Sequence, residues 1–126
     1  MHVSSLKKKD MILSLTKLYK VPSITTESVD MQLGNFDFFL FDCNSPGSYR
    51  RCHLPGAKHL DPADYKESDL PSNKNFTLVF YCSGILCGAS AYAAKRARNM
   101  GHQKVYVMTD GLSGWIHSGR STESML

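Results

Sequence analysis

The sequence has no apolar run long enough to cross a membrane as a helix. It also has no internal repeat and no low-complexity stretch. These absences argue against a membrane-spanning protein, a repeat solenoid and a disordered chain, and we expect no membrane partner. With 126 residues, of which 42% are hydrophobic and 21% charged, the chain has the composition of one packed domain.

The amino terminus lacks a complete signal peptide. Lys7 to Lys9 resemble its basic region, but Asp10 and Lys17 interrupt the apolar stretch and no A-x-A-like cleavage site follows. Apolar residues here recur at helical spacing, at Met11, Ile12, Leu15 and Leu18. We therefore expect residues 1–20 to form a helical N-terminal extension. The expected location is cytoplasmic, or periplasmic if a leader has been removed.

Aromatic and basic residues do not interleave in the way that a base-stacking platform requires. The net charge is +4, but Lys and Arg are scattered along the chain apart from short clusters. A solvated surface explains this spread, so we expect no nucleic-acid partner. A mildly basic field would favour small anionic substrates.

The four cysteines, Cys43, Cys52, Cys82 and Cys87, lack metal-ligand spacing. They form no pair of C-x-x-C knuckles, and no two histidines stand at zinc-ligand spacing. We predict no metal site and no cofactor. Free thiols in a reducing compartment are the simplest expectation, and Cys43 and Cys52 are expected to be packing residues.

Apolar runs of strand length recur along the chain. They cover residues 36–41, 58–60, 76–81 and 104–108. The first is nearly continuous, which is typical of a strand covered on both faces, as in a parallel sheet.

Helix-forming segments separate these runs. They are residues 26–33 after helix-capping chemistry, one turn after Ser45-Pro46 through Arg51, a brief helix opened by Asp61-Pro62, residues 89–100, and a last helix holding Trp115. This alternation predicts an α/β fold with a parallel sheet. We expect the domain to cover residues 21–120, with residues 121–126 as a C-terminal tail.

Cys82 is the candidate nucleophile. It stands where the strand 76–81 ends and before the helix 89–100 begins. In open α/β sheets, ligands bind beyond the carboxyl ends of the strands. A thiol there faces backbone N–H groups and the positive end of a helix dipole, which favour the reactive thiolate.

Four segments in order and at proper spacing resemble the rhodanese family. Residues 41–49, Phe-Asp-Cys-Asn-Ser-Pro-Gly-Ser-Tyr, occupy the place of its D-V-R-x-P-x-E-Y segment. Residues 53–57, His-Leu-Pro-Gly-Ala, match its H-I-P-G-A signature. Tyr81-Cys82 falls at its active-site cysteine, and residues 110–115 look like its closing G-G-x-x-x-W. The resemblance covers roughly residues 21 to 119.

The resemblance implies a rhodanese-like three-layer domain with a central, mostly parallel sheet flanked by helices. It also implies a sulfurtransferase in which Cys82 carries sulfane sulfur as a persulfide. The donor would be thiosulfate or another small sulfur-containing anion or persulfide, and the acceptor cyanide or a thiol, including a protein thiol. From its place after an apolar strand, Asp42 is expected to support the site by orienting its loop through hydrogen bonds, or else to cap the turn at Ser45. His53, beside Leu54-Pro55-Gly56, is expected to support it through a structural hydrogen bond in a tight turn, with a general base as the alternative.

The substrate-binding loop implied by the resemblance consists of Ser83, Gly84, Ile85, Leu86, Cys87 and Gly88. Its amides are expected to surround the persulfide and the anionic donor. Gly84 and Gly88 are expected to adopt strained dihedral angles that turn successive N–H groups inward.

The loop departs from the family pattern in its charge. Many rhodaneses have a cation at the fifth position after the cysteine, where this chain has Cys87, and position 44 lacks the family's arginine. Donor binding would then depend on backbone amides and the helix dipole, so we expect weak turnover of thiosulfate.

Cys87 supports two interpretations. It could approach Cys82 within disulfide reach and either resolve the persulfide or form a reversible bridge that protects Cys82 from over-oxidation. Alternatively, it is a small buried filler at the start of the helix.

Two other functions remain as alternatives. Phosphatases and arsenate reductases on a similar fold also use a loop cysteine, but Gly88 stands where a C-x5-R signature requires arginine. The other alternative is a non-catalytic interaction module that keeps the fold. The sequence does not specify an oligomeric state or the physiological donor and acceptor.

Overall fold

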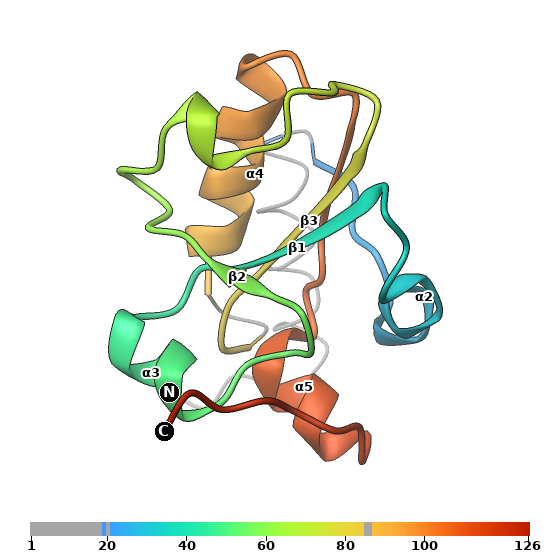
Figure 1. The fold of residues 1–126 in the computed structure, drawn as a ribbon, viewed down its shortest axis with the longest axis vertical. Helices are drawn as coiled ribbons and strands as arrows, with labels where there is room; N and C mark the ends of the chain where they lie inside the picture. The colour runs from blue at the N-terminus through green and yellow to red at the C-terminus, as the bar shows by residue number, and fades with distance from the viewer. Residues whose placement is uncertain (1–18, 20, 85–86) are drawn as a thin grey trace, which may run out of the picture.

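Four parallel strands form a single sheet in the protein, seen in a computed structural model that describes Tyr19, residues 21–84 and residues 87–126. The strands are β1 (Phe38–Asp42), β2 (Lys58–His59), β3 (Thr77–Tyr81) and β4 (Lys104–Val107), in the spatial order β2-β1-β3-β4 (Figure 1). The segment around Ser23 adds a parallel bridge to Val107 at the β4 edge. The predicted α/β fold with a parallel sheet is confirmed.

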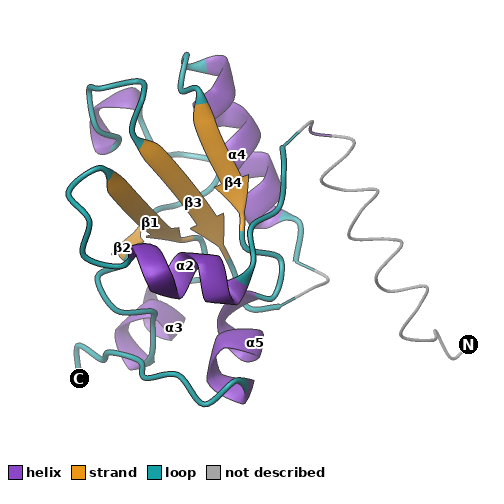
Figure 2. Ribbon diagram, turned by 90° about the vertical axis from the view of Figure 1, so that its right-hand side faces the viewer, coloured by secondary structure: helices purple, strands orange, loops and turns teal. Residues whose placement is uncertain are grey.

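Helices cover both faces of this sheet. The helices of the described chain are α2 (Thr26–Gln32), α3 (Pro46–Arg51), α4 (Ala89–Asn99) and α5 (Gly111–His117), with a short 3₁₀ helix η1 (Glu67–Asp69). Figure 2 shows α2 in front of the sheet and α4 behind it, and the strand arrows point toward α3 and α5. Parallel strands with helices on both faces make the expected three layers.

The helix caps explain two of the helix starts. The Thr25 hydroxyl accepts a hydrogen bond from the Ser28 amide at 3.1 Å and begins α2. The Ser45 hydroxyl accepts from the Ser48 amide at 3.2 Å, with Pro46 in the first turn of α3. Both caps satisfy amides that have no acceptor within the helix.

Side chains of β3 alternate between two hydrophobic clusters. Leu78 and Phe80 belong to the cluster that packs against α4, and we call this side the α4 face. Val79 and Tyr81 belong to the cluster that includes Trp115 of α5, and we call this side the α5 face. The period of two along a strand therefore decides which layer each side chain reaches.

The predicted helix at Asp61-Pro62 is wrong. The chain makes only a turn there, in which the Asp61 carboxylate accepts from the Ala63 amide at 3.0 Å, and the nearby helix is η1. The turn does not continue into a helix, because the Pro62 carbonyl accepts from the Arg96 guanidinium of α4 at 3.2 Å and the Lys66 amide donates to the Asp69 carboxylate at 2.7 Å. The first strand also begins later than predicted, at Phe38, and Phe36 is exposed.

The segment after α5 returns along the domain. The indole of Trp115 donates to the Ser121 carbonyl at 2.8 Å, and Glu123 forms an antiparallel bridge with His53. The Glu123 carboxylate accepts from the Gly56 amide at 2.7 Å. The predicted tail 121–126 therefore packs against the loop between α3 and β2.

The predicted helical extension, residues 1–20, lies outside the described residues except for Tyr19. Among the residues that the structure describes, no helix has the length and apolar character needed to span a membrane.

Candidate active site

Cys82 directly follows β3 and continues its alternation. Its side chain joins Leu78 and Phe80 on the α4 face, and only 2% of the residue is exposed. The sulfur therefore lies at the carboxyl end of a central strand, as the sequence predicted, but it points between the sheet and α4.

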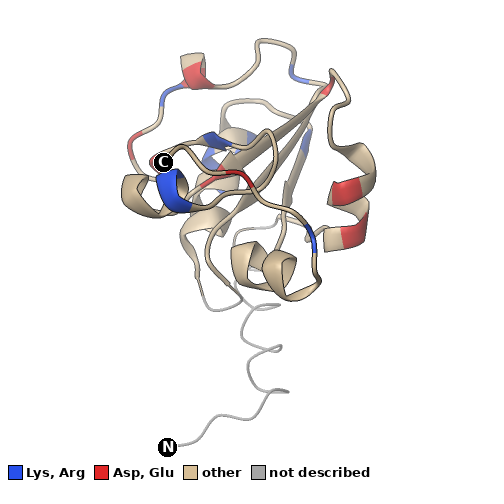
Figure 3. Cartoon of the chain, turned by 60° about the horizontal axis from the view of Figure 1, so that its bottom comes forward, with Lys and Arg blue, Asp and Glu red and all other residues tan. Residues whose placement is uncertain are grey.

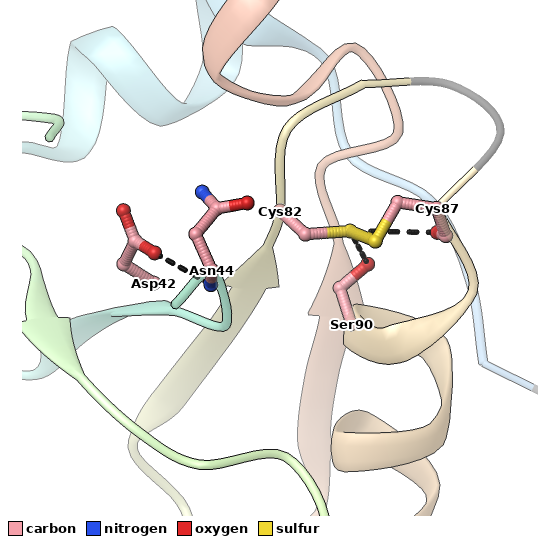
Figure 4. Close-up of a disulfide and its surroundings, with 5 residues drawn as sticks. All are labelled: Asp42, Asn44, Cys82, Cys87 and Ser90. Atoms are coloured by element: carbon pink, nitrogen blue, oxygen red, sulfur yellow. Dashed lines mark hydrogen bonds between the residues drawn. A yellow bond between two sulfur atoms is a disulfide. The ribbon is translucent and has the colours of Figure 1, made fainter. Parts of the chain in front are cut away.

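Cys82 is bonded to Cys87 by a disulfide, with the two Cα atoms 6.3 Å apart (Figure 4). The expectation of four free thiols is thus wrong for this pair, while Cys43 and Cys52 are free. The five-residue separation lets a tight loop bring the two side chains together, and the Cys87 amide donates to the Gly84 carbonyl at 3.2 Å. Of the two interpretations of Cys87, disulfide reach is what the structure shows.

Ser90 is a site residue that sequence reasoning missed. Its buried hydroxyl lies 3.4 Å from the Cys82 sulfur, and the carbonyl oxygen of Cys87 lies at the same distance from that sulfur (Figure 4). A sulfur in a disulfide carries no proton, so the Ser90 hydroxyl is the donor in this contact. Its place in the first turn of the helix after the cysteine loop was the available signal.

The start of α4 adds positive potential next to the sulfurs. Gly88 is the N-cap residue of this 11-residue helix, and no side chain caps it. Amides of the first helical turn have no acceptor within the helix and carry the positive end of its dipole. This end would stabilise an anionic sulfur on either cysteine.

Backbone amides of α5 hold the described part of the loop by donating to carbonyl groups of the loop. The Leu112 amide donates to the Cys82 carbonyl at 2.8 Å, and the Ser113 amide donates to the Ser83 carbonyl at 2.9 Å. In a trans peptide the C=O and N–H groups point in opposite directions, and no cis peptide is present in the described chain. The amides of Ser83 and Gly84 therefore point away from α5.

Gly111 makes this attachment possible. It has φ +64°, and a Cβ atom there would lie 2.7 Å from the Cys82 carbonyl oxygen and from the Gly84 nitrogen. The expected strained angles at Gly84 and Gly88 are wrong, because Gly88 has φ −88° and Gly84 does not have a positive φ. The glycine that the loop requires stands on the opposing helix.

Two predicted loop residues, Ile85 and Leu86, lie outside the described residues. The complete ring of amides around the sulfur therefore stays a prediction. Ser83, Gly84, Cys87 and Gly88 lie along the described ends of the loop between β3 and α4.

Asp42 supports the sheet on the other face. Its fully buried carboxylate accepts hydrogen bonds from the Tyr81 hydroxyl at 2.7 Å and from the backbone N–H of Asn44 at 2.8 Å. The Tyr81 hydroxyl in turn accepts from the Leu54 amide at 3.1 Å. Burial, then the Asp42 charge, raise the pKa of Tyr81 above its usual range. Because Tyr81 points to the α5 face, this network stabilises the strand before Cys82 without contacting its sulfur.

His53 is a structural residue in this arrangement. Its ring is buried, donates from Nδ1 to the Tyr49 carbonyl at 2.6 Å, and stacks on the Tyr49 ring with 4.0 Å between centroids. Its backbone exchanges two hydrogen bonds with Glu123. Among the described residues, no hydrogen bond joins His53 to Cys82.

Asn44 occupies the position where the family has arginine. Its buried side-chain nitrogen has no hydrogen-bond partner among the described residues. In the view of Figure 4, this amide lies between Asp42 and Cys82. In that view the side-chain oxygen of Asn44, and not its nitrogen, is on the side of Cys82.

Charged side chains are absent from the described parts of the loop and from α5. Figure 3 shows these segments without Lys, Arg, Asp or Glu, and no Lys or Arg stands between Cys82 and Lys95 in the sequence. Cys43, buried near the site, has a pKa raised first by burial and then by Asp42 and Asp61. Its thiol is therefore unreactive at neutral pH.

An open hollow of about 450 Å³ lies beside the loop. Its lining residues are Ser83, Leu112, Ser113, Ile116 and His117. In the described part of the chain, no group of three or more His, Cys, Asp or Glu side chains is arranged to hold a metal ion.

A family model described as a rhodanese-like domain matches residues 25–118. No curated protein sequence matches the chain significantly. The matched residues include both cysteines of the loop, the Asp42 strand and α5.

Solved structures share the fold at low sequence identity. The BH2092 protein from Bacillus halodurans is 20% identical, with a TM-score of 0.74 over 95% of this chain and 88% of that one. A thiosulfate sulfurtransferase from Pseudomonas aeruginosa is 19% identical, with a TM-score of 0.78 over 94% of this chain but 23% of that one. The RPA3614 protein from Rhodopseudomonas palustris, described as a possible tyrosine phosphatase, is 23% identical, with a TM-score of 0.69 over 98% of both chains.

Proposed function

Because the chain belongs to the rhodanese-like domain family, we propose that it is a sulfurtransferase whose reduced Cys82 carries sulfane sulfur as a persulfide. The observation that carries this proposal is the place of the Cys82 sulfur, at the carboxyl end of β3 and beside the first turn of α4. Two of its solved neighbours in fold are described as a thiosulfate sulfurtransferase and a 3-mercaptopyruvate sulfotransferase.

The chemistry consists of two displacements. The Cys82 thiolate attacks the sulfane sulfur of thiosulfate or a persulfide, and sulfite or a thiol leaves. Cyanide or a thiol, including a protein thiol, then takes this sulfur and restores the thiolate. Each step moves one sulfur atom between nucleophiles and needs no metal or cofactor.

Hydrogen-bond donors and the helix dipole would replace the missing loop cation. The Ser90 hydroxyl lies against the sulfur, and the Ser83 and Gly84 amides point away from α5. A helix terminus contributes about 0.3–2 kcal/mol to an anion, so binding of dianionic thiosulfate is weak and a persulfide is the better donor.

Phosphoryl transfer receives no support from the loop. A phosphatase loop of this type needs a guanidinium that grips phosphate oxygens, and Gly88 occupies that position. Hydrolysis of an aryl phosphate is the direct assay, and we expect none.

The deciding experiment uses Cys87→Ser, which cannot form the disulfide. After reduction and removal of the reductant, this variant is incubated with a low-molecular-weight persulfide, and its intact mass is measured. We expect a gain of one sulfur atom that cyanide removes as thiocyanate. Cys82→Ser/Cys87→Ser is the matched control and gains none. If both variants stay unmodified, the domain is a non-catalytic interaction module instead.

A further inference from the structure

The disulfide between Cys82 and Cys87 assigns a second reaction to the site. We propose that Cys87 resolves the Cys82 persulfide and releases the outer sulfur as hydrosulfide. In this reaction the sulfane sulfur is reduced and the two protein thiols are oxidised to the disulfide. This inference rests on the proposed persulfide chemistry and adds a product to it.

The Cys82 and Cys87 sulfurs are close enough for this reaction. They are bonded to each other in the structure, whereas Cys43 and Cys52 are free and bonded to no other cysteine. An internal thiol at this distance acts at a very high effective concentration, so it competes with any external acceptor for the persulfide. The persulfide on Cys82 is therefore short-lived in the wild-type chain.

The electrostatics favour this pair over the other thiols. Both sulfurs lie at the start of α4, whose positive end stabilises the Cys87 thiolate that attacks the persulfide. The environment of Cys43 disfavours thiolate instead, since burial and the carboxylates of Asp42 and Asp61 raise its pKa. A cysteine that only fills space in the core is expected to have an environment like that of Cys43.

The resolving step balances in atoms and electrons. The Cys87 thiolate attacks the Cys82 sulfur, the bond between the Cys82 sulfur and the outer sulfur breaks, and hydrosulfide leaves with the bonding pair. The two protein thiols are oxidised to the disulfide, and the sulfane sulfur is reduced to sulfide. With thiosulfate as donor, the sum is one protein dithiol plus thiosulfate giving one disulfide, one hydrosulfide and one bisulfite.

A dithiol reductant would return the protein to its reduced state. Cys82 is 2% exposed whereas Cys87 is half-buried, so an incoming thiol reaches the Cys87 sulfur first. Attack there makes a mixed disulfide on Cys87 and expels Cys82 as thiolate. The nucleophile is thus freed for the next donor molecule while Cys87 completes exchange with the second thiol of the reductant.

The test is a single turnover without any reductant. Wild type, Cys87→Ser and Cys52→Ser are reduced, desalted and incubated with thiosulfate in the absence of oxygen. Hydrosulfide is then quantified, and the intact mass is measured after alkylation. For wild type and Cys52→Ser, we expect one hydrosulfide per chain and a protein that has lost two hydrogens and carries the Cys82–Cys87 disulfide. For Cys87→Ser, we expect one added sulfur atom and no hydrosulfide.

The possible results separate this inference from the proposed function. A wild-type protein that keeps the added sulfur and releases no hydrosulfide overturns the resolving role but leaves the transferase intact. A Cys87→Ser variant that never gains sulfur, from thiosulfate or from a low-molecular-weight persulfide, overturns the proposed function itself. If Cys87→Ser released as much hydrosulfide as wild type, the resolving role of Cys87 would also be overturned.

Discussion

The hydroxyl of Tyr81 donates a hydrogen bond to the carboxylate of Asp42 across the two central strands, and both side chains are fully buried. Asp42 is the register partner of Tyr81 in the parallel pairing of β1 and β3. The residue before the candidate nucleophile is therefore anchored on the α5 face while Cys82 points to the α4 face.

Replacing Tyr81 with Phe removes this donor and leaves a buried carboxylate oxygen without its partner. We expect the free energy of unfolding to fall by about 1–3 kcal/mol. Urea unfolding of the reduced protein measures the change. Tyr92→Phe is the control, because Tyr92 is half-exposed, and it should change stability by less than about 0.5 kcal/mol. Equal effects of the two substitutions would contradict a structural role for the Tyr81–Asp42 pair.

Replacing Gly111 with Ala would force a Cβ atom against the Cys82 carbonyl oxygen and the Gly84 nitrogen. Gly119→Ala is the matched control, since Gly119 has φ +84° but open space around its Cβ position. We expect Gly111→Ala to cost about 1–3 kcal/mol more than the control. It should also slow sulfur loading of Cys82 in the Cys87→Ser background, whereas Gly119→Ala should not.

Removing the Ser90 hydroxyl should weaken stabilisation of the Cys82 thiolate. In the Cys87→Ser background, we expect Ser90→Ala to lower the rate of Cys82 alkylation at neutral pH by about ten- to a hundredfold, since a hydrogen bond to a charged group contributes about 1.5–3 kcal/mol. Peptide mass spectrometry identifies the alkylated cysteine. Ser90→Thr keeps the hydroxyl and should retain most of the rate. An unchanged rate in Ser90→Ala would exclude the contact from thiolate stabilisation.

Cys43 should resist alkylation in the folded, reduced protein. Burial and the charges of Asp42 and Asp61 raise its pKa, so it stays protonated up to about pH 9, above the pKa of an ordinary thiol. Cys52, which is free and half-buried, should be labelled under the same conditions. Labelling of Cys43 is expected only after unfolding in denaturant, and rapid labelling in the folded state would contradict its burial.

His102 should make the protein less stable as the pH falls. Burial and the neighbouring Lys74 lower its pKa from the ordinary value of 6.5, and Glu67 opposes this shift. The folded state therefore favours the neutral ring. Its contribution to stability is fully present above pH 6.5 and is lost as the pH falls through the lowered value.

Urea unfolding near pH 7.5 and near pH 5, on either side of the ordinary histidine pKa, tests this linkage. Wild type should lose more stability between the two conditions than His102→Gln, whose side chain does not titrate. His117→Gln, at the exposed end of α5, is the control and should follow wild type. A pH dependence that is identical in wild type and His102→Gln would exclude this residue as the cause.

Sequence patterns predicted the elements whose signals are local. The start of α2, the apolar run of β3 and the alanine-rich α4 depend on contacts within a few residues, and each appears within one residue of its predicted bounds. The prediction of a helix at Asp61-Pro62 was wrong because a distant partner, Arg96 of α4, donates to the Pro62 carbonyl, while the Lys66 amide donates to the Asp69 carboxylate, so the next helical hydrogen bond does not form. The prediction that Phe36 belongs to the first strand was wrong, because a turn at Asn35 leaves Phe36 outside the sheet.

The sequence by itself determined that this chain is a parallel α/β domain with Cys82 at the end of a strand and before a helix, because those features follow from local periodicity and chain order. Only the tertiary structure decided that Cys82 meets Cys87 and Ser90 on the α4 face while Asp42 lies on the other face. It also decided that Gly111, distant in the chain, is the glycine against which the loop packs. The positions of Asp42 and Gly111 depend on how separate elements approach one another in space, which no short-range pattern encodes, whereas the five-residue spacing of Cys82 and Cys87 allowed the disulfide without deciding it.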